Sequence, residues 1–504
     1  MENNLNKNDR ESVKITLERH KWPDEIKKER QRNFLIFGLT LAVVASFTLG
    51  WITNGVLNTS TATTAVTNNT QLKRFEEVYK TLLNKWYFSN DMTDPSSQLI
   101  DNAINGMLDI NGDIHTSYLS AKQATDLSQT INGEFVGIGV QYNASGGLNM
   151  ITKVFKNSPA EKAGIKAGDR IISVDGEDVT SFTSDQLVEK ITGELGTTVV
   201  VGLQRGGENL TLSIVRDTVN SLAYGYMMDN NVGYLELTSF GQSLYTVSKS
   251  YLADFASQGA TKLIIDLRSN GGGYLSAIEE VSKLFIPKGD TIYQIENKDG
   301  SIDVSKARDV NEYNYDKIVI LINGGTASAS EVLTLALKEN ASLNVSVVGD
   351  VSYGKGTAQT QVSLSDGGVL KYTYAKWLDP QGNNINGQGI TPDVAVKLND
   401  FFYQTYPELS EGEQYPFDTV GSPVSYVQYG LRYLGYSISR VDGYYDSTTL
   451  TAMKAFQTTQ GLTEDGVITQ DIIERINSAA TKYYYENIQQ QDVQLIKAAE
   501  VINQ

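Results

Sequence analysis

Cysteine is absent from the 504 residues of this chain. Its absence excludes a disulfide framework, a lipidated cysteine and a sulfur ligand for a zinc site. The composition, with 40% apolar residues and 44 glycines, is typical of folded globular protein, so ordinary hydrophobic cores must supply the stability. The length exceeds what one core serves and predicts two to four domains.

Charge is absent from Asn33 to Leu72. The apolar first part of this stretch, residues 33–53, has the length of a helix that crosses a bilayer of roughly 30 Å. Residues 1–32 carry nine Lys and Arg, and the next positive charge is Lys73, so we expect a cytoplasmic N-terminus and an extracytoplasmic remainder. A cleaved signal peptide is the alternative, which the long charged leader and the weak small-x-small pattern around Val43–Ala45 disfavour.

Histidine occurs only twice, as His20 and His115. His20 falls in the predicted cytoplasmic leader, so His115 is the only candidate for a Ser-His-Asp triad, although it follows a turn instead of ending a core strand. A zinc site would need carboxylates almost alone, against the preference of zinc for nitrogen and sulfur. We therefore expect no metal and no cofactor, and a hydrolase of this sequence needs lysine or a carboxylate as its base.

Positive charge is scarce outside the leader. From residue 33 onward the chain carries 33 Lys and Arg against 52 Asp and Glu, a net charge of −19. Such an acidic ectodomain speaks against nucleic acid and anionic lipid as partners.

A short-strand pattern with glycine punctuation runs from about 132 to 216 and contains "FVGIGV" and "SPAEKAGIKAGDRI", followed by a "VDG" turn. It resembles a PDZ domain. The resemblance implies that a glycine-bearing loop offers backbone N–H groups to the terminal carboxylate of a peptide that pairs with a strand edge. The residues of that loop would be Val136, Gly137, Ile138, Gly139 and Val140. An unrelated small β domain is the alternative.

Apolar, β-branched runs such as "KLIIDL" and "KIVILI" alternate with helical stretches between 217 and 395. This order is typical of an α/β core with a mainly parallel sheet, in which ligand and catalytic groups lie at strand ends. Lys355 stands between two glycines after one such strand, and burial there would lower its pKa from about 10.4 toward neutrality. Gln359, at i+4, would lie on the same side and could orient a neutral amine.

These motifs occur together: "IIDLRSNGGG", then "NGGTASASE", then "GKGTAQ", all after the PDZ-like region. Between about 73 and 394 the chain resembles the C-terminal processing peptidases, or tail-specific proteases. The resemblance implies a serine endopeptidase with a Ser-Lys dyad, in which Ser328 is the nucleophile, Lys355 the base and Gln359 its partner. It also suggests a homodimer.

Two serines compete for the nucleophile's role. Ser328 matches the motif register, three residues before Glu331, whereas the spacing to Lys355 is about two residues longer than the family's and would fit Ser330. A two-residue insertion in the surface turn "KENASLNVS" explains the difference at little cost and favours Ser328. For the oxyanion hole we expect the N–H groups of Ala329 and of a glycine in "RSNGGGYL", with Gly272 as the candidate.

Residues about 422–478 resemble a peptidoglycan-binding-like domain through "LRYLGY", "DGYYD" and "TAMKAFQTTQGL". A helical docking module without glycan binding is the alternative. The last residues read as a polar terminal helix.

The sequence thus predicts a multidomain α/β protein in eight segments. These are a cytoplasmic leader (1–32), a transmembrane helix (33–53), a linker (54–72), a helical region (73–130), a PDZ domain (131–216), a serine protease core (217–397), a peptidoglycan-binding-like domain (422–480) and a terminal helix (481–504). The predicted function is that of a membrane-anchored, extracytoplasmic serine endopeptidase that selects protein C-termini. The alternative is an inactive scaffold that binds protein tails and cell wall.

Overall fold

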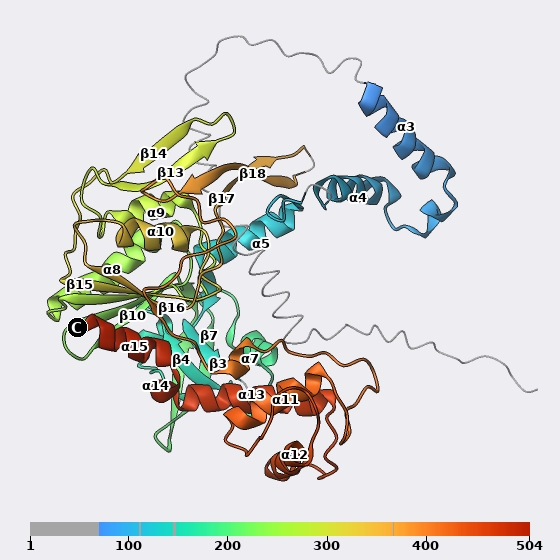
Figure 1. Cartoon of the computed structure of the whole chain (residues 1–504), viewed down its shortest axis with the longest axis vertical. Helices are drawn as coiled ribbons and strands as arrows, with labels where there is room; N and C mark the ends of the chain where they lie inside the picture. The colour runs from blue at the N-terminus through green and yellow to red at the C-terminus, as the bar shows by residue number, and fades with distance from the viewer. Residues whose placement is uncertain (1–69, 110–111, 145–147, 366) are drawn as a thin grey trace, which may run out of the picture.

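The computed structural model describes residues 70–504, apart from 110–111, 145–147 and 366 (Figure 1). The predicted leader, transmembrane helix and most of the linker lie outside this part. Among the described helices, none combines the length and the apolar character that a membrane crossing requires.

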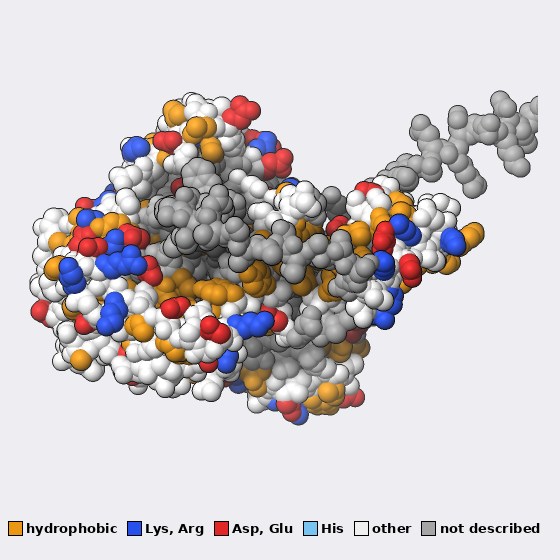
Figure 2. All heavy atoms as spheres, turned by 90° about the horizontal axis from the view of Figure 1, so that it is seen from above, with side chains coloured by type: hydrophobic (Ala, Val, Ile, Leu, Met, Phe, Trp, Pro, Cys, Tyr) orange, Lys and Arg blue, Asp and Glu red, His pale blue; other side chains and the backbone are white. Residues whose placement is uncertain are grey.

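The described chain begins with a helical arm, made of α3 (Thr70–Lys85), η1 (Tyr87–Asp91) and α4 (Pro95–Asp109). Neither α3 nor α4 buries a single residue, and the arm stands away from the body of the molecule (Figure 1). The face seen in Figure 2 shows hydrophobic side chains gathered on this arm between charged ones. Phe75, Val78 and Met107 are among these exposed apolar residues.

The predicted helical region also supplies a strand that sequence periodicity did not indicate. β1 (Ser117–Leu119) pairs antiparallel with β18 (Val369–Leu378), a strand of the protease core. α5 (Ala121–Asn132) follows, with Ser120 and Gln123 forming a capping box at its start. The segment before the PDZ domain is therefore part of the protease core in space.

The PDZ domain is a six-stranded antiparallel sheet closed by short helices, with its own core around Ile151, Val174 and Val201. A two-stranded ribbon of β2 and β9 joins it to the rest of the molecule. The elements are β2 (Glu134–Gly137), β3 (Val140–Asn143), β4 (Met150–Val154), α6 (Pro159–Lys162), β5 (Arg170–Val174), β6 (Glu177–Asp178), α7 (Ser184–Ile191), β7 (Thr198–Arg205), β8 (Glu208–Val215) and β9 (Asp217–Asn220).

The protease core is built on a six-stranded sheet of order β10-β11-β12-β15-β16-β19, in which every neighbouring pair except β10–β11 is parallel. The mainly parallel sheet predicted from the sequence is present. Its strands are β10 (Ala223–Met228), β11 (Val232–Leu237), β12 (Lys262–Asp266), β15 (Lys317–Ile322), β16 (Val345–Gly349) and β19 (Val394–Ala395).

Helices cover both faces of this sheet because its strands are apolar on both sides. On β12, Leu263 and Ile265 join the core formed with α8 (Leu244–Ser257), α9 (Leu275–Ser282) and α10 (Ala329–Lys338), whereas Ile264 joins the core on the other face. A second sheet, made of β1, β13 (Thr291–Asn297), β14 (Ile302–Lys306), β17 (Thr357–Ser363) and β18, lies beyond α9 and α10 (Figure 1).

The C-terminal domain consists of helices around an aromatic core that includes Phe401, Tyr426 and Phe456. Its elements are η3 (Asp400–Tyr403), α11 (Ser422–Tyr433), α12 (Ser447–Thr459) and α13 (Gln470–Glu486). α13 runs past residue 480, where we had expected the domain to end, and its last residue, Glu486, forms an ion pair with Arg170 of the PDZ domain at 2.6 Å.

The expected polar terminal helix is instead a short turn of helix, α14 (Ile488–Gln491), and a packed helix, α15 (Val493–Ile502). α15 buries Ala498, Val501 and Ile502 against the second face of the core sheet. Its N-cap, Asp492, pairs with Arg268 at 2.6 Å. The end of the chain therefore belongs to the protease core, which local polarity alone did not indicate.

Replacing Ile502 by Ala tests this docking. The side chain is buried, so its removal should cost about 2–4 kcal/mol of unfolding free energy through lost burial and a residual cavity. Ile496 on the same helix is 39% exposed, and Ile496→Ala should change stability by no more than about 0.5 kcal/mol. Chemical unfolding followed by circular dichroism measures both; equal effects would contradict the packing described.

Candidate active site

Ser328 is the N-cap of α10, at the end of the loop that leaves the parallel strand β15. Its φ angle is 56°, in the left-handed region that residues with a side chain seldom occupy. Such backbone strain persists only where surrounding contacts hold it, and it is concentrated at functional sites. The side chain is largely buried at the carboxyl edge of the sheet, where the parallel-strand pattern predicted it.

Ser330 has a different environment. It is fully buried, and its hydroxyl donates to the carbonyl oxygen of Asn270 at 2.9 Å. The two hydroxyls that the sequence left in competition are therefore not equivalent, because that of Ser330 is already engaged in the packing of α10 against the glycine loop.

Glu331 connects the segments of Ser328 and Lys355. Its carboxylate is fully buried and accepts from the backbone N–H of Ser328 at 2.8 Å and from that of Lys355 at 2.9 Å, both on Oε2. On Oε1 it accepts from Gly354 N–H at 2.6 Å and from the Ser352 hydroxyl at 2.5 Å. Burial raises the pKa of Glu331, and these four donors oppose that rise.

Lys355 is almost completely buried, and its carbonyl oxygen accepts from Trp377 Nε1 at 2.6 Å. Burial lowers the pKa of its amine to about 8, although the carboxylates of Glu331 and Asp113 favour the charged form. A substantial fraction of the amine is thus neutral near physiological pH, as a general base requires.

Gln359 lies on β17, also buried, and its Nε2 donates to the hydroxyls of Thr357 at 2.9 Å and Thr373 at 3.0 Å. Lys355 precedes β17, on which Gln359 pairs with Thr373 of β18. That the two side chains lie on one side, as the i+4 spacing predicts, stays a prediction.

Two further titratable side chains lie in this neighbourhood, and sequence reasoning set one aside and missed the other. Burial lowers the pKa of Lys371 to about 6 and that of His115 to about 4, and the charge of Lys355 contributes to both shifts. The β1–β18 pairing brings His115 here. Lys371 carried a usable signal, because it occupies the inward phase of β18 together with Ala375 and Trp377.

The glycine loop lies against the start of α10. A methyl group on Gly272 would lie 2.8 Å from both the Ala329 nitrogen and the Ser328 Cβ, so only glycine fits. The N–H of Ala329 opens α10, where backbone donors have no acceptor within the helix. The N–H of Gly272, however, donates to Asn270 Oδ1 at 2.9 Å. In this conformation the expected Gly272 donor is therefore already engaged.

The predicted carboxylate loop connects β2 to β3 at the edge of the PDZ domain. Gly139 has φ +87° there, and an added Cβ would lie 2.3 Å from that of Ser158. Ile138 is buried in the PDZ core, and its carbonyl accepts from Ala160 N–H at 2.8 Å. The loop is thus formed by backbone in a fixed conformation, with Val136, Gly137 and Val140 completing it.

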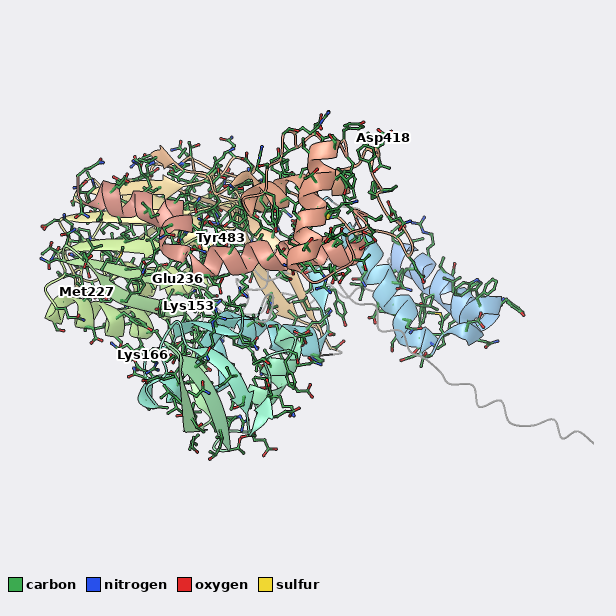
Figure 3. All side chains as sticks on the ribbon, turned by 90° about the horizontal axis from the view of Figure 1, so that it is seen from below. Lys153, Lys166, Met227, Glu236, Asp418 and Tyr483 are labelled. Atoms are coloured by element: carbon green, nitrogen blue, oxygen red, sulfur yellow. The ribbon has the colours of Figure 1, made fainter. Side chains whose placement is uncertain are left out.

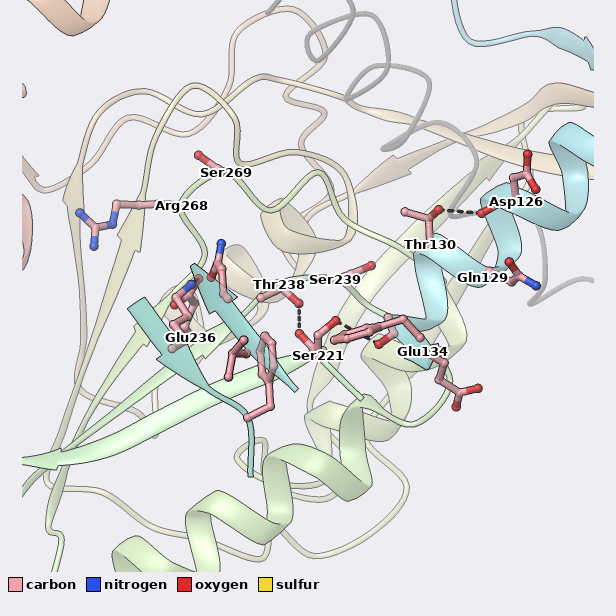
Figure 4. A pocket seen from close by; sticks show the side chains of 16 residues that line it. Asp126, Gln129, Thr130, Glu134, Ser221, Glu236, Thr238, Ser239, Arg268 and Ser269 are labelled. Carbon is pink, nitrogen blue, oxygen red and sulfur yellow. Dashed lines mark hydrogen bonds and ion pairs between the residues drawn. The ribbon is translucent and has the colours of Figure 1, made fainter. Parts of the chain in front are cut away.

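A pocket of about 800 Å³ opens beside this loop, between the PDZ domain, α5 and the protease core (Figure 4). Phe135, Val140 and Phe155 line it from the PDZ side, and Arg268 and Ser269 line it from the segment that leads into the glycine loop. An ion pair of Lys153 with Glu236 at 2.5 Å fastens the two domains at its edge (Figure 3).

No cluster of three or more acidic or histidine side chains capable of holding a metal ion occurs within the described residues. The buried ionisable groups near Ser328 are amines, one imidazole and carboxylates that already accept hydrogen bonds.

Comparison with known proteins assigns each of the three domains. Residues 231–396 match peptidase family S41, residues 125–204 the PDZ domain and residues 420–476 a peptidoglycan binding domain. The carboxy-terminal processing protease CtpA of Bacillus subtilis (strain 168) is 35% identical over 94% of this chain and 99% of its own length. The chain belongs to the carboxy-terminal processing proteases. It is a serine peptidase, and the resemblance inferred from its motifs is confirmed.

Two further matches cover smaller shares of the chain. A protein named "Probable CtpA-like serine protease" in Staphylococcus epidermidis (strain ATCC 12228 / FDA PCI 1200) is 33% identical over 81% of this chain and 84% of its own length. Among solved structures, a photosystem II D1 C-terminal processing protease is 26% identical, with a TM-score of 0.38, over 65% of this chain and 94% of that one.

Gly272→Ala tests the close approach of the glycine loop to Ser328 in this carboxy-terminal processing protease. The added methyl group must displace Ser328 or Ala329, so peptidase activity should fall about 10- to 100-fold. Gly289 is the matched control: its φ is also positive, +94°, but its Cβ position is open. Gly289→Ala should share the backbone cost of about 1 kcal/mol and keep the activity. Parallel loss of activity in both variants would contradict this geometry.

Proposed function

We propose that this protein is a membrane-anchored, extracytoplasmic serine endopeptidase that recognises protein C-termini through its PDZ domain and cleaves by a Ser328–Lys355 dyad. The observation that carries the proposal is the shared carboxylate of Glu331, which accepts from the backbone of both residues and so holds their segments side by side. The lowered pKa of the buried Lys355 adds the chemical competence of a base.

In the proposed mechanism the neutral Lys355 amine takes the proton of the Ser328 hydroxyl as its oxygen attacks the scissile carbonyl carbon. The oxyanion accepts hydrogen bonds from Ala329 N–H and from the glycine loop, whose Gly272 must release Asn270 or leave the role to a neighbouring glycine. The Lys355 ammonium then protonates the leaving amine as the peptide C–N bond breaks. Water attacks the acyl-enzyme in a second round, with Lys355 again as base, and releases the acid.

Substrate selection follows from the PDZ loop. A terminal carboxylate would accept from the backbone N–H groups between Val136 and Val140, and an apolar side chain near it would enter the pocket lined by Phe135 and Phe155. Because that pocket continues to Arg268 and Ser269, a tail bound there would lie beside the segment that leads to the oxyanion loop.

The remaining partners rest on separate features. The uncharged stretch at 33–53 would anchor the chain in the cell membrane with its N-terminus in the cytoplasm. The C-terminal domain would bind peptidoglycan. The helical arm, whose apolar residues are exposed on α3 and α4, would form contacts in a homodimer.

Substitutions at Ser328, Ser330 and Lys355 test the dyad. With an unstructured protein bearing an apolar C-terminus, Ser328→Ala and Lys355→Met should each lower kcat by about 10³-fold or more, because nucleophile and base act as a unit. Ser330→Ala removes one buried hydrogen bond and should cost about 1 kcal/mol of stability with activity within about tenfold of wild type.

The pH profile of the wild-type protein gives a second readout. The reactive form is the neutral amine, so kcat/KM should rise with pH through an apparent pKa near 8 and fall away below it. An inactive wild-type chain would favour the alternative, a scaffold that binds protein tails and cell wall without cleaving. Normal cleavage by Ser328→Ala would refute the assignment of the nucleophile.

Binding of the free C-terminus is tested with labelled peptides and the Ser328→Ala chain, which should bind without cleaving. A peptide with an apolar last residue and a free carboxylate should bind at least about tenfold more tightly than its C-terminally amidated form, because charge-assisted hydrogen bonds are lost on amidation. Fluorescence anisotropy measures both affinities. Equal affinities would show that the loop from Val136 to Val140 does not read the carboxylate.

A further inference from the structure

The side-chain amide of Gln359 is held at one end only. Both hydrogens of Nε2 are used, since this atom donates to Thr357 Oγ1 at 2.9 Å and Thr373 Oγ1 at 3.0 Å. The carbonyl oxygen, Oε1, is buried and has no hydrogen-bond partner within the described part of the chain. Buried acceptors are rarely left unpaired, so this oxygen can take one further donor.

Two threonine hydroxyls decide which way this amide points. The Thr373 hydroxyl also interacts with the side chain of Asp113, and a carboxylate can only accept. The hydroxyl hydrogen is therefore directed to Asp113, and the hydroxyl oxygen is left to accept from Gln359 Nε2. The carbonyl therefore faces away from Thr357 and Thr373. The carbonyl oxygen of Lys355 and the amide of Gln359 both contact the inward face of β18, through Trp377 and Thr373 respectively.

We propose that Thr373 is a positioning residue that holds the Gln359 amide with its carbonyl oxygen toward the Lys355 amine. This inference rests on the proposed Ser-Lys mechanism. A neutral amine has two N–H donors and one lone pair. When one N–H is directed to Gln359 Oε1, the lone pair is restricted in direction and can be kept for the hydroxyl proton of Ser328. The same oxygen then stabilises the ammonium group that forms as Ser328 attacks.

Residues that precede β1 hold the backbone of Thr373 in place. Its backbone N–H donates to Thr116 Oγ1 at 3.1 Å, and that hydroxyl donates to Asp113 Oδ2 at 2.6 Å. The strand pairing of β1 with β18 thus extends a line of hydrogen bonds from Asp113 to Gln359. This line connects β1, which precedes the PDZ domain in the sequence, to the side chain of Gln359.

Several charged or titratable groups surround Lys355 and affect the pH dependence of the activity. Glu331 on α10 and Asp113 in the loop before β1 favour its ammonium form. Lys371 on β18 and His115 before β1 interact electrostatically with it, and their own pKa values are lowered well below ordinary values. Replacing Thr373 keeps every one of these groups but removes a hydroxyl that lowers the pKa of Asp113. Replacing Thr357, which donates to none of them, therefore gives the shift caused by Gln359 alone.

The test compares Thr373→Val with Thr373→Ser in the full chain. Val keeps the shape and removes the hydroxyl, so kcat should fall about tenfold at unchanged KM. The acidic limb of the pH profile should also move to lower pH, because the ammonium form of Lys355 loses an acceptor. Ser restores the hydroxyl, so it should restore both kcat and the position of the acidic limb. Thr211→Val, at an exposed position of β8 in the PDZ domain, is the matched control and should behave as wild type.

Thermal unfolding of each variant shows whether a loss of activity comes from lost stability. Thr357→Val removes the other hydroxyl that accepts from Gln359 and should also move the acidic limb of the pH profile to lower pH. The inference would be overturned if Thr373→Val kept the wild-type kcat and pH profile. It would also be overturned if Thr373→Val and Thr373→Ser lost kcat equally while the acidic limb of the pH profile stayed in place. Failure of the proposed function looks different, because Ser328→Ala or Lys355→Met would then remain active.

Discussion

The buried carboxylate of Glu331 is the constraint on which the site depends. An ionised carboxylate inside a protein is tolerated only when hydrogen bonds replace its hydration, and four donors do so here. Two of them are the backbone N–H groups of Ser328 and Lys355, which are 27 positions apart in the chain. The requirement to satisfy one charge thus fixes the start of α10 and the turn before β17 relative to each other. The hydrogen bond from Ser328 N–H to Glu331 also helps to retain the strained φ of Ser328.

The lowered pKa of Lys355 follows from where that turn lies. Lys355 is enclosed between α10 and the second sheet, so desolvation lowers its pKa. Burial alone thus gives a chain almost without histidine an amine that titrates near neutrality. Lys371 and His115 experience the same environment and lose their charge more completely. The three groups therefore form one coupled site, in which the negative charge needed to hold a proton comes from Glu331 and Asp113.

The parallel sheet and the segments that carry Ser328 and Lys355 could be predicted from the sequence. Apolar β-branched runs predicted the parallel strands, and local motifs indicated Ser328, Lys355 and the PDZ loop. Each of these features is encoded within a few consecutive residues. The pairing of β1 with β18, the docking of α15 and the engagement of the Gly272 N–H by Asn270 were not predicted. Each depends on contacts between segments whose local periodicity carries no information about their partner.

Arg268 shows how those long-range contacts meet at the site. Its guanidinium is held by Asp266, at the end of β12, and by Asp492, at the start of α15, each at 2.6 Å. Burial of such a group is tolerable only because both carboxylates neutralise it. The same residue lines the pocket beside the PDZ loop and immediately precedes the glycine loop. The pocket, the glycine loop and the C-terminal helix are thus connected through one ion-pair network, so a change at Arg268 is expected to affect all three.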